Sequence, residues 1–252
     1  MKRTFLLITL ILVLIQFSIQ AAEPAYLAFS SDHCFSQEEC NYFSIPELYN
    51  SLKGDRPSYE SFYVAMEGFL NLKKKGVLLK ENILTLIDYS LSSAKKRLWV
   101  IDVSKKEILY NELVAHGMNS GSEFAQHFSN KAESYMSSLG FYVTGSTYNG
   151  KNGLSLQLDG MEKGINDNAR SRTIVIHMAK YVSQNYIDQC GRLGRSFGCP
   201  ALPGKTGENI IDTMAGGTCL FIFYPDDTYF LQSSYVNGNF DNDMGGRPLS
   251  IN

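Results

Sequence analysis

The sequence has no excess of basic residues: 23 lysines and arginines stand against 25 aspartates and glutamates, a net charge of −2. Nucleic-acid-binding proteins normally carry a basic patch or stripe, so this balance argues against nucleic acid as a partner. Metal signatures are also missing, since the chain has four histidines and neither an H-E-x-x-H nor a C-x-x-C spacing. We therefore expect no cofactor and no metal, although His116, His177 and Cys199 are acceptable zinc ligand types.

Long apolar runs are absent after the N-terminus. There, Lys2 and Arg3 precede an uncharged apolar run over 4–19, and small residues follow it. Residues 1–22 have the pattern of a secretory signal peptide, because the run is shorter than the about 20 apolar residues of a spanning helix. We expect secretion across the inner membrane to the periplasm or cell envelope, with cleavage after Ala22; an uncleaved membrane anchor is the alternative. Cleavage would leave 21 basic and 25 acidic residues, a net charge of −4.

Cysteine is scarce and odd in number, with five in the chain. In an exported protein an odd count implies at least one unpaired or intermolecular thiol. Cys34 and Cys40 would suit a small local disulfide, and Cys219, in an apolar run, is most simply a small buried hydrophobe. Cys199 has the glycine-rich, arginine-flanked setting of a reactive thiol, with a Cys190–Cys199 disulfide as the alternative.

Helical signals are concentrated before residue 82. Ser44 is a suitable N-cap for a short helix over 44–52 that has a proline in its first turn. Ser58 is an N-cap for the clearest helix, 58–75, whose apolar residues recur every three or four positions. We therefore expect residues 23–81 to form an N-terminal linker and a helical lobe.

From residue 82 the apolar pattern favours strands over helices. Runs rich in β-branched and aromatic residues predict strands at 83–89, 97–102, 107–117, 141–144, 154–160, 172–177 and 218–224. Asn149-Gly150 is a strong signal for a hairpin turn, and short helices are expected at 181–189 and 208–215. The expected organisation is a mainly β (α+β) domain over 82–230, followed by a loose tail over 231–252.

One stretch, 191–203, contains three glycines, two prolines and two arginines in the sequence GRLGRSFGCPALP. Helix interiors reject glycine and proline, and central strands reject proline, so the stretch is a shaped loop. Cys199 lies near its end, and His177 ends the apolar run RTIVIH further upstream. A cysteine and a histidine held by two such segments predict a thiol nucleophile and its base.

The surroundings of Cys199 suit a reactive thiol. A free thiol has a pKa of about 8.5 and needs a base or a positive environment near neutral pH. We expect the charges of Arg192 and Arg195 to lower the pKa of the thiol, and Gly198 to let nearby amides point at a developing oxyanion. A histidine at a strand end is also a common structural residue, so a structural role for His177 stays open at this point.

The segments IVIHM and GRLGRSFGCP together resemble the signature of the L,D-transpeptidase catalytic domain (YkuD-like) family. That signature is a strand ending in His-Gly, a spacer and Ser/Thr-x-Gly-Cys; here it reads His177-Met178 and Ser196-Phe197-Gly198-Cys199. Three further segments resemble the murein L,D-transpeptidase branch of that family, namely LYNELVAHGMNSGSEFAQHFSN, SSLGFYVTGSTYNGKNGLSLQLDGME and NDNARSRTIVIH. The similarity covers residues 45–225.

This resemblance implies an L,D-transpeptidase-like β-sandwich and a cysteine acyltransferase that acts on peptidoglycan stem peptides. Cys199 would attack the carbonyl of the third stem residue and release the terminal D-Ala, and an amine of a neighbouring stem would resolve the thioester as a 3→3 cross-link. His177 would take and return the proton, with the Met178 carbonyl orienting its ring. The backbone amides of Gly198 and Cys199 would hold the oxyanion.

The chain departs from the family pattern around its cysteine. Met178 replaces the usual glycine, Phe197 stands where many members have histidine, and Pro200 begins a segment without the usual arginine. We expect Arg195 or Arg192 to bind a stem carboxylate instead. These differences concern substrate choice and outcome more than the identity of the nucleophile.

Ser196, together with Phe197, belongs to the expected substrate side of the site. His116 opens a Gly/Ser loop and is a further candidate to line the cleft, with a capping or turn role as the alternative. Two other functions stay open: an L,D-carboxypeptidase or endopeptidase that uses water as acceptor, and a catalytically silent wall-binding module. The sequence predicts no oligomeric state.

Overall fold

The computed structural model describes residues 44–151 and 153–236. The expected signal peptide over 1–22 and the cysteines Cys34 and Cys40 lie outside these residues. Within the described part of the chain, no helix combines the length and apolarity needed to cross a membrane.

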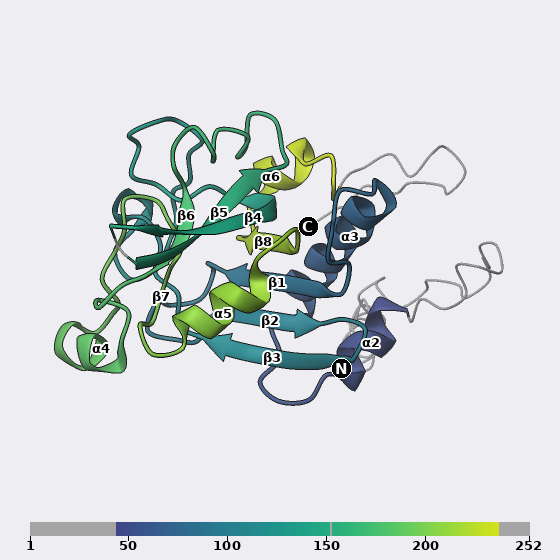
Figure 1. Cartoon of the computed structure of the whole chain (residues 1–252), viewed down its shortest axis with the longest axis horizontal. Helices are drawn as coiled ribbons and strands as arrows, with labels where there is room; N and C mark the ends of the chain where they lie inside the picture. Colours follow the sequence, from purple (N-terminus) through teal and green to yellow (C-terminus); the bar gives the residue numbers. More distant parts are fainter. Residues whose placement is uncertain (1–43, 152, 237–252) are drawn as a thin grey trace, which may run out of the picture. The chain divides into compact units, whose positions relative to one another are not determined.

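The strands form one eight-stranded mixed sheet of order β3-β2-β1-β8-β4-β5-β6-β7 (Figure 1). The prediction of a mainly β fold with a few helices is confirmed. The strands are β1 Ile83–Asp88, β2 Leu98–Asp102, β3 Glu107–Glu112, β4 Gly140–Gly150, β5 Gly153–Gly160, β6 Val175–Met178, β7 Ala201–Leu202 and β8 Cys219–Phe223. The pairs β1–β8 and β6–β7 are parallel, and the other neighbours are antiparallel.

Two hairpins contribute strand pairs to the sheet, β2–β3 at one edge and β4–β5 in its interior. The predicted hairpin around residues 104–106 is confirmed, because β2 and β3 pair antiparallel up to Asp102 and Glu107. The other predicted turn, Asn149-Gly150, is displaced: both residues belong to β4, and Gly150 pairs with Gly153 of β5. The register of the long β4–β5 ladder, rather than the local turn preference, decides where this hairpin turns.

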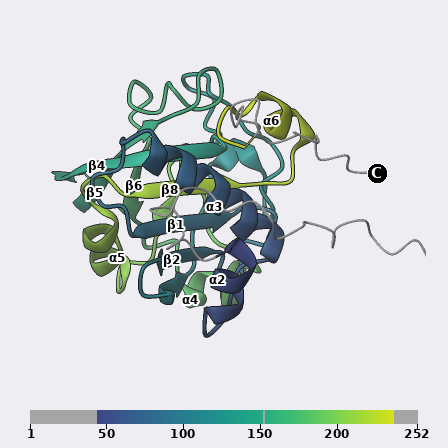
Figure 2. The ribbon, with the colours of Figure 1, turned by 90° about the vertical axis from the view of Figure 1, so that its right-hand side faces the viewer.

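The predicted helices are present with small shifts of their ends. They are α2 Ile45–Ser51, α3 Tyr59–Lys74, α4 Gln184–Cys190 and α5 Gly207–Met214. The sequence did not predict α6 Asp227–Gln232 or the 3-10 turn η1 at Met118–Ser120. Ser44 and Ser58 cap α2 and α3 as expected, each accepting from the backbone three residues on. Helix α3 contacts β1 and β8, while α5 contacts β4, β5 and β6 (Figure 2).

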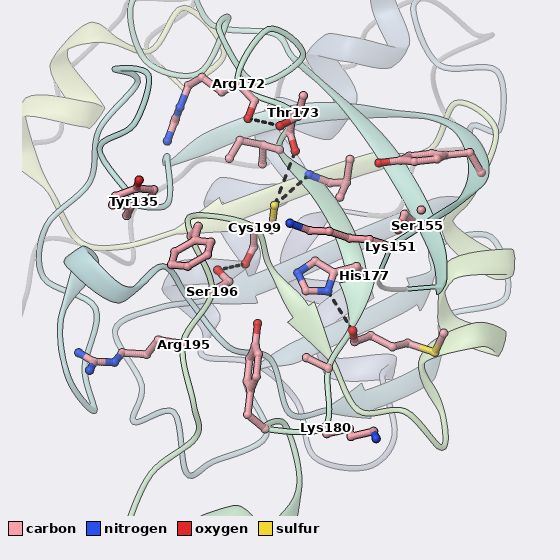
Figure 3. Close-up of a pocket in the computed structure, with 18 of the residues that line it drawn as sticks. Tyr135, Lys151, Ser155, Arg172, Thr173, His177, Lys180, Arg195, Ser196 and Cys199 are labelled. Atoms are coloured by element: carbon pink, nitrogen blue, oxygen red, sulfur yellow. Dashed lines mark hydrogen bonds between the residues drawn. The ribbon is translucent and has the colours of Figure 1, made fainter.

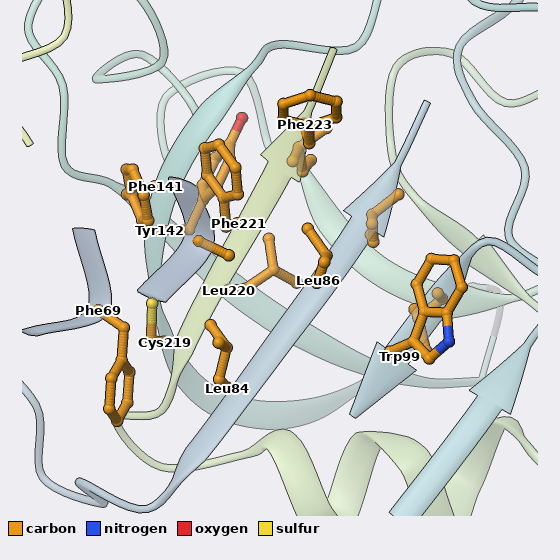
Figure 4. Packing of buried hydrophobic residues seen from close by; sticks show 14 of the residues in the cluster. Phe69, Leu84, Leu86, Trp99, Phe141, Tyr142, Cys219, Leu220, Phe221 and Phe223 are labelled. Atoms are coloured by element: carbon orange, nitrogen blue, oxygen red, sulfur yellow. The ribbon is translucent and has the colours of Figure 1, made fainter. Parts of the chain in front are cut away.

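The core lies around the two central strands, β1 and β8, in which every residue is buried. The rings of Phe141 and Phe221 stack at 4.1 Å between β4 and β8 (Figure 4). Helix α3 reaches this stack through Gly68, where an added Cβ would lie 1.9 Å from Cζ of Phe141. The helix therefore approaches the sheet at a point that only glycine permits.

The packing of both ends of the described chain bears on the expected organisation. The helices α2 and α3, expected to pack on the β domain, share one hydrophobic core with its strands. A loose tail was expected from residue 231, but residues 231 and 232 end α6, and the side chains of Ser233, Tyr235 and Val236 are buried. The buried carboxylate of Glu162 contributes, because it accepts hydrogen bonds from the hydroxyls of Tyr229 and Ser233.

Candidate active site

Cys199 and His177 are brought together by the parallel pair β6–β7. His177 pairs with Ala201, and the backbone N–H of Val175 donates to Sγ of Cys199 at 3.4 Å. The side chains of Cys199 and His177 both line the same cavity, and Figure 3 shows the thiol and the imidazole next to each other in front of β6.

The imidazole of His177 is oriented by the main chain. Its Nδ1 lies 2.9 Å from the Met178 carbonyl oxygen, which can only accept, so Nδ1 carries the proton and the lone pair is on Nε2. Burial lowers the pKa of His177, and the charge of Lys151 lowers it further, whereas the hydrogen bond to the Met178 carbonyl raises it. The ring is therefore neutral near pH 7, as a general base must be.

The surroundings of the Cys199 thiol shift its pKa in opposite directions. Burial raises the pKa of Cys199, whereas the Val175 N–H, the charges of Arg172 and Lys151 and the thiol's own backbone amide lower it. Both Cys190 and Cys199 are free thiols, so the alternative of a disulfide between them is excluded.

The cations beside the thiol are not the two we expected. Nη1 of Arg192 donates to the Leu193 carbonyl, and Nη1 of Arg195 donates to the carbonyl of Gly121 at 3.0 Å. These backbone oxygens hold both guanidinium groups away from Cys199, and neither charge is among the main influences on the pKa of the thiol. That expectation was wrong, because the loop conformation directs the two side chains elsewhere.

The loop before Cys199 is braced by Ser196. Its hydroxyl accepts from the Gly198 N–H at 3.1 Å and donates to the Cys199 carbonyl at 2.5 Å. The Gly198 amide, expected in an oxyanion hole, is thus engaged within the loop, and the Cys199 amide is the donor left beside the thiol. Gly198 has φ +123°, and a Cβ there would lie 2.9 Å from the Met136 carbonyl, so glycine is required.

A cavity of about 850 Å³ opens in front of the thiol. Besides Cys199 and His177, its walls carry four cationic side chains and one acidic one, namely Lys151, Arg172, Lys180, Arg195 and Glu133. Their net positive charge favours an anionic ligand. Among the described residues, no three histidine, cysteine or acidic side chains are grouped as metal ligands would be.

Two exposed aromatic rings stand at the edge of this cavity. Phe197 is 68% exposed and Tyr135 is 42% exposed, and their ring centroids are 5.0 Å apart. Both residues line the cavity, as do Arg195 and Ser196. Phe197, Arg195 and Ser196 thus line the cavity, whereas their contact with a substrate stays a prediction.

His116 and Arg192, the other expected substrate-side residues, do not line the cavity. His116 is fully buried behind the loop, and its Nδ1 lies 2.8 Å from Nη2 of the buried Arg97. Its carbonyl accepts the Ser196 N–H at 3.0 Å, so it supports the cysteine loop from behind. The expectation that it lines the cleft was wrong because Arg97 occupies the interior beside it.

Sequence reasoning missed three residues of the site. Arg172 begins the β-branched run that ends at His177, which is the one signal that would have pointed to it. Lys151 lies at the β4–β5 hairpin and Tyr135 in a polar loop, and neither position carries a local signal of its role.

A mainly β domain with a histidine on β6 and a cysteine in the loop before β7, both lining one cationic cavity, defines the type of site. The chain belongs to the L,D-transpeptidase catalytic domain family, whose model matches residues 54–223. Among curated proteins, no match to the chain is found.

Solved structures of similar fold include L,D-transpeptidases. An L,D-transpeptidase from Mycobacterium smegmatis is 11% identical, with a TM-score of 0.36 over 57% of this chain and 59% of that one. An L,D-transpeptidase from Stackebrandtia nassauensis is 12% identical, with a TM-score of 0.35 over 67% and 68%. The helical cell shape determining protein Pgp2 from Campylobacter jejuni is 13% identical, with a TM-score of 0.39 over 64% and 54%. The chain spans about 59% of the length of the Mycobacterium smegmatis structure.

Proposed function

We propose that this protein is a cysteine acyltransferase that performs L,D-transpeptidation on peptidoglycan stem peptides. The observation that carries the proposal is the 2.9 Å contact between His177 Nδ1 and the Met178 carbonyl, beside the thiol of Cys199. It leaves Nε2 of His177 as an available base in the cavity that the thiol also lines. Membership of the L,D-transpeptidase catalytic domain family supplies the substrate class.

In the first half-reaction, Cys199 is the nucleophile. Its Sγ attacks the carbonyl carbon of the third stem residue while Nε2 of His177 takes the thiol proton. The Cys199 amide donates to the oxyanion of the tetrahedral intermediate. The intermediate collapses when the bond to the terminal D-Ala breaks; His177 returns the proton to that amine, and a thioester remains on Cys199.

In the second half-reaction, the thioester is transferred to an acceptor. The amine of a neighbouring stem attacks the thioester carbonyl, His177 removes its proton, and the departing Cys199 sulfur takes the proton back. The product is a 3→3 cross-link. The same steps with water as acceptor would yield a trimmed tripeptide, the outcome of an L,D-carboxypeptidase.

The charge of the cavity supports a stem peptide as the ligand. Its terminal carboxylate is anionic, and Lys151, Lys180 and Arg195 line the cavity at its accessible side. Family members usually carry an aliphatic residue and then arginine or asparagine after the cysteine, where this chain has Pro200-Ala201-Leu202. We therefore propose that cations from these other segments bind that carboxylate. Arg192 is not one of them.

The purified protein with a disaccharide-tetrapeptide tests this function directly. We expect mass spectrometry to find a thioester adduct on the protein and cross-linked dimers in solution. The matched control is Cys199→Ala, which should keep the fold and lose the adduct. An adduct that persists on Cys199→Ala would show that another residue is the nucleophile. Tripeptides without dimers would establish the hydrolase, and no adduct and no product would contradict the proposed enzyme.

We also propose that the protein acts outside the cytoplasm, because its expected substrate lies there. The charged start and the apolar run within residues 1–22 support export. Cell fractionation, with N-terminal sequencing of the protein recovered from the envelope, tests this. Recovery of the full chain in the cytoplasm would contradict it, and a mature N-terminus at residue 23 would support it.

A further inference from the structure

Arg172, in the turn before β6, is bound by a distant segment of the chain. Its four hydrogen-bond acceptors all belong to residues 129–138, which we call the rim loop. They are the Ser129 carbonyl (2.7 Å) and Ser138 Oγ (2.6 Å) for Nη1, and the Met136 carbonyl (2.8 Å) and Ser134 Oγ (3.2 Å) for Nη2. A planar guanidinium with several fixed donors is suited to hold such a set, which the point charge of a lysine cannot reproduce.

The rim loop needs to be held. Glu133 has φ 56° and Tyr135 has φ 54°, a left-handed conformation that costs non-glycine residues about 1–3 kcal/mol each unless the surroundings enforce it. From the other side, Asn119 donates to the carbonyls of Ser134 and Tyr135. Arg172 and Asn119 thus grip the loop between them and set Tyr135 against Phe197 at the edge of the cavity.

The same guanidinium lies close to Gly198, the residue before the nucleophile. Nη2 of Arg172 is 3.6 Å from the position a Cβ would take on Gly198, and the carbonyl of Thr173 lies 3.7 Å from Sγ of Cys199. None of the ion pairs in the described part of the chain includes Arg172. A half-buried cation without a carboxylate stabilises the thiolate form of a neighbouring cysteine.

We propose that Arg172 is a positioning residue with two linked tasks: it holds the rim loop, and Tyr135 with it, at the edge of the substrate cavity, and its charge stabilises the thiolate of Cys199. The first task rests on the proposed function, because it concerns how the stem peptide binds. The second concerns the thiol alone and stands without a substrate.

Other groups also influence the ionisation of the Cys199 thiol, and their effects have to be distinguished from that of Arg172. They are His177 and the Val175 N–H from β6, Lys151 from the β4–β5 hairpin, Tyr181 from the segment after β6, and Tyr89 from the segment after β1. The two tyrosines are uncharged near pH 7, since burial raises the pKa of each to about 12. Lys151 is exposed, so solvent screens its charge. Arg172 is the cation that hydrogen bonds fix in place.

Alkylation of the thiol by iodoacetamide, followed by mass spectrometry against pH, tests the charge. The variants are Arg172→Gln, which removes the charge and the fork, and Arg172→Lys, which keeps the charge only. Arg170→Gln is the matched control. Arg170 lies two positions before Arg172, and it forms an exposed ion pair with Asp159. We expect Arg172→Gln to move the midpoint of Cys199 alkylation up by about one pH unit and to slow alkylation at pH 7 about tenfold. Arg172→Lys and Arg170→Gln should keep the midpoint of the unchanged protein.

Hydrogen exchange over residues 129–138 and the KM for the stem tetrapeptide test the grip on the rim loop. Both Arg172 variants should lose protection there and raise KM several-fold, while Arg170→Gln should not. A purely structural role predicts equal alkylation profiles for Arg172→Gln and Arg172→Lys, and that result would overturn the charge assignment. Unchanged exchange in Arg172→Lys would overturn the grip, even if Arg172→Gln did not fold. If Cys199 is alkylated as expected but the protein never forms a thioester, the proposed function is refuted. The roles of Arg172 toward the thiol and the rim loop would then still stand.

Discussion

Nδ1 of His116 lies 2.8 Å from Nη2 of the buried Arg97, and its Nε2 lies 3.4 Å from the Gly121 carbonyl. An arginine can only donate, so Nδ1 accepts and the proton is on Nε2. This pairing requires a neutral imidazole beside a cation. Burial and the charge of Arg97 accordingly lower the pKa of His116 to about 3.

The first prediction concerns acid stability. Between pH 6.5 and about 3 the unfolded chain protonates His116 and the folded chain does not, so the free energy of unfolding should fall as the pH drops. The slope from this group is about 1.4 kcal/mol per pH unit. His116→Gln, whose amide can also accept and donate, should flatten the slope between pH 6.5 and 5 in urea titrations. The control His127→Gln removes an exposed histidine and should keep the slope; an equal slope in both variants would refute the assignment.

The second prediction concerns the pH dependence of catalysis. His177 must be neutral to take the thiol proton, and a pKa lowered by burial keeps it neutral at lower pH. The acid limb of kcat/KM should therefore lie below pH 6.5, the ordinary histidine value. Lys151→Gln removes a charge that also lowers this pKa, so its acid limb should move upward. A limb above pH 6.5 in the unchanged protein would contradict the assignment of His177 as the base.

The third prediction concerns the core. In Gly68→Ala, the new Cβ would lie 1.9–2.4 Å from three ring atoms of Phe141, which stacking on Phe221 prevents from moving away. Alanine gains about 1 kcal/mol in helix propensity, whereas overpacking of this kind costs roughly 1–3 kcal/mol or more. We expect net destabilisation in chemical denaturation. The exposed Lys74→Ala in the same helix should leave stability within about 0.5 kcal/mol; a stabilised Gly68→Ala would show that the ring can move.

The fourth prediction concerns the aromatic edge of the cavity. Phe197 is largely exposed and contacts Tyr135, so Phe197→Ala should leave the free energy of unfolding within about 0.5 kcal/mol. An aromatic contact with the substrate is worth about 0.5–1.5 kcal/mol, which corresponds to a rise in KM of about 2-fold to 13-fold. Steady-state kinetics on the tetrapeptide measure this. The exposed Leu231→Ala on α6 is the control, and a fall in kcat at constant KM would contradict a binding role.

Much of the fold could be predicted because its local signals agree with its packing. Ser58 caps α3, and the apolar spacing that follows is the face it buries. The run that became β8 is apolar throughout and the run that became β1 is largely so, as is typical of strands buried on both faces. The turn at Asn149-Gly150 was misplaced because cross-strand pairing lengthened β4, and the inward packing of Tyr235 depends on partners far away in the sequence.

The part of the site that could be predicted consists of residues whose type alone points to a chemical role. Cys199 and His177 stand out by type and by the segments that hold them. The directions of Arg192 and Arg195 depend on loop dihedrals that no pattern encodes, and so does the engagement of the Gly198 amide by Ser196. The role of Arg172 depends on contacts with a loop 34 to 43 residues away in the chain, a distance over which sequence spacing carries no information.

The partner of His177 Nδ1 is a main-chain atom, and this has a consequence for how the site can change over time. Every amino acid at position 178 has a main-chain carbonyl. A point mutation there therefore keeps the group that orients His177, and the side chain can change without removing it. This explains why methionine is tolerated there in place of glycine. Removing the contact would take chemistry on the backbone itself, such as a semisynthetic protein with an ester between Met178 and Ala179, whose carbonyl is a weaker acceptor.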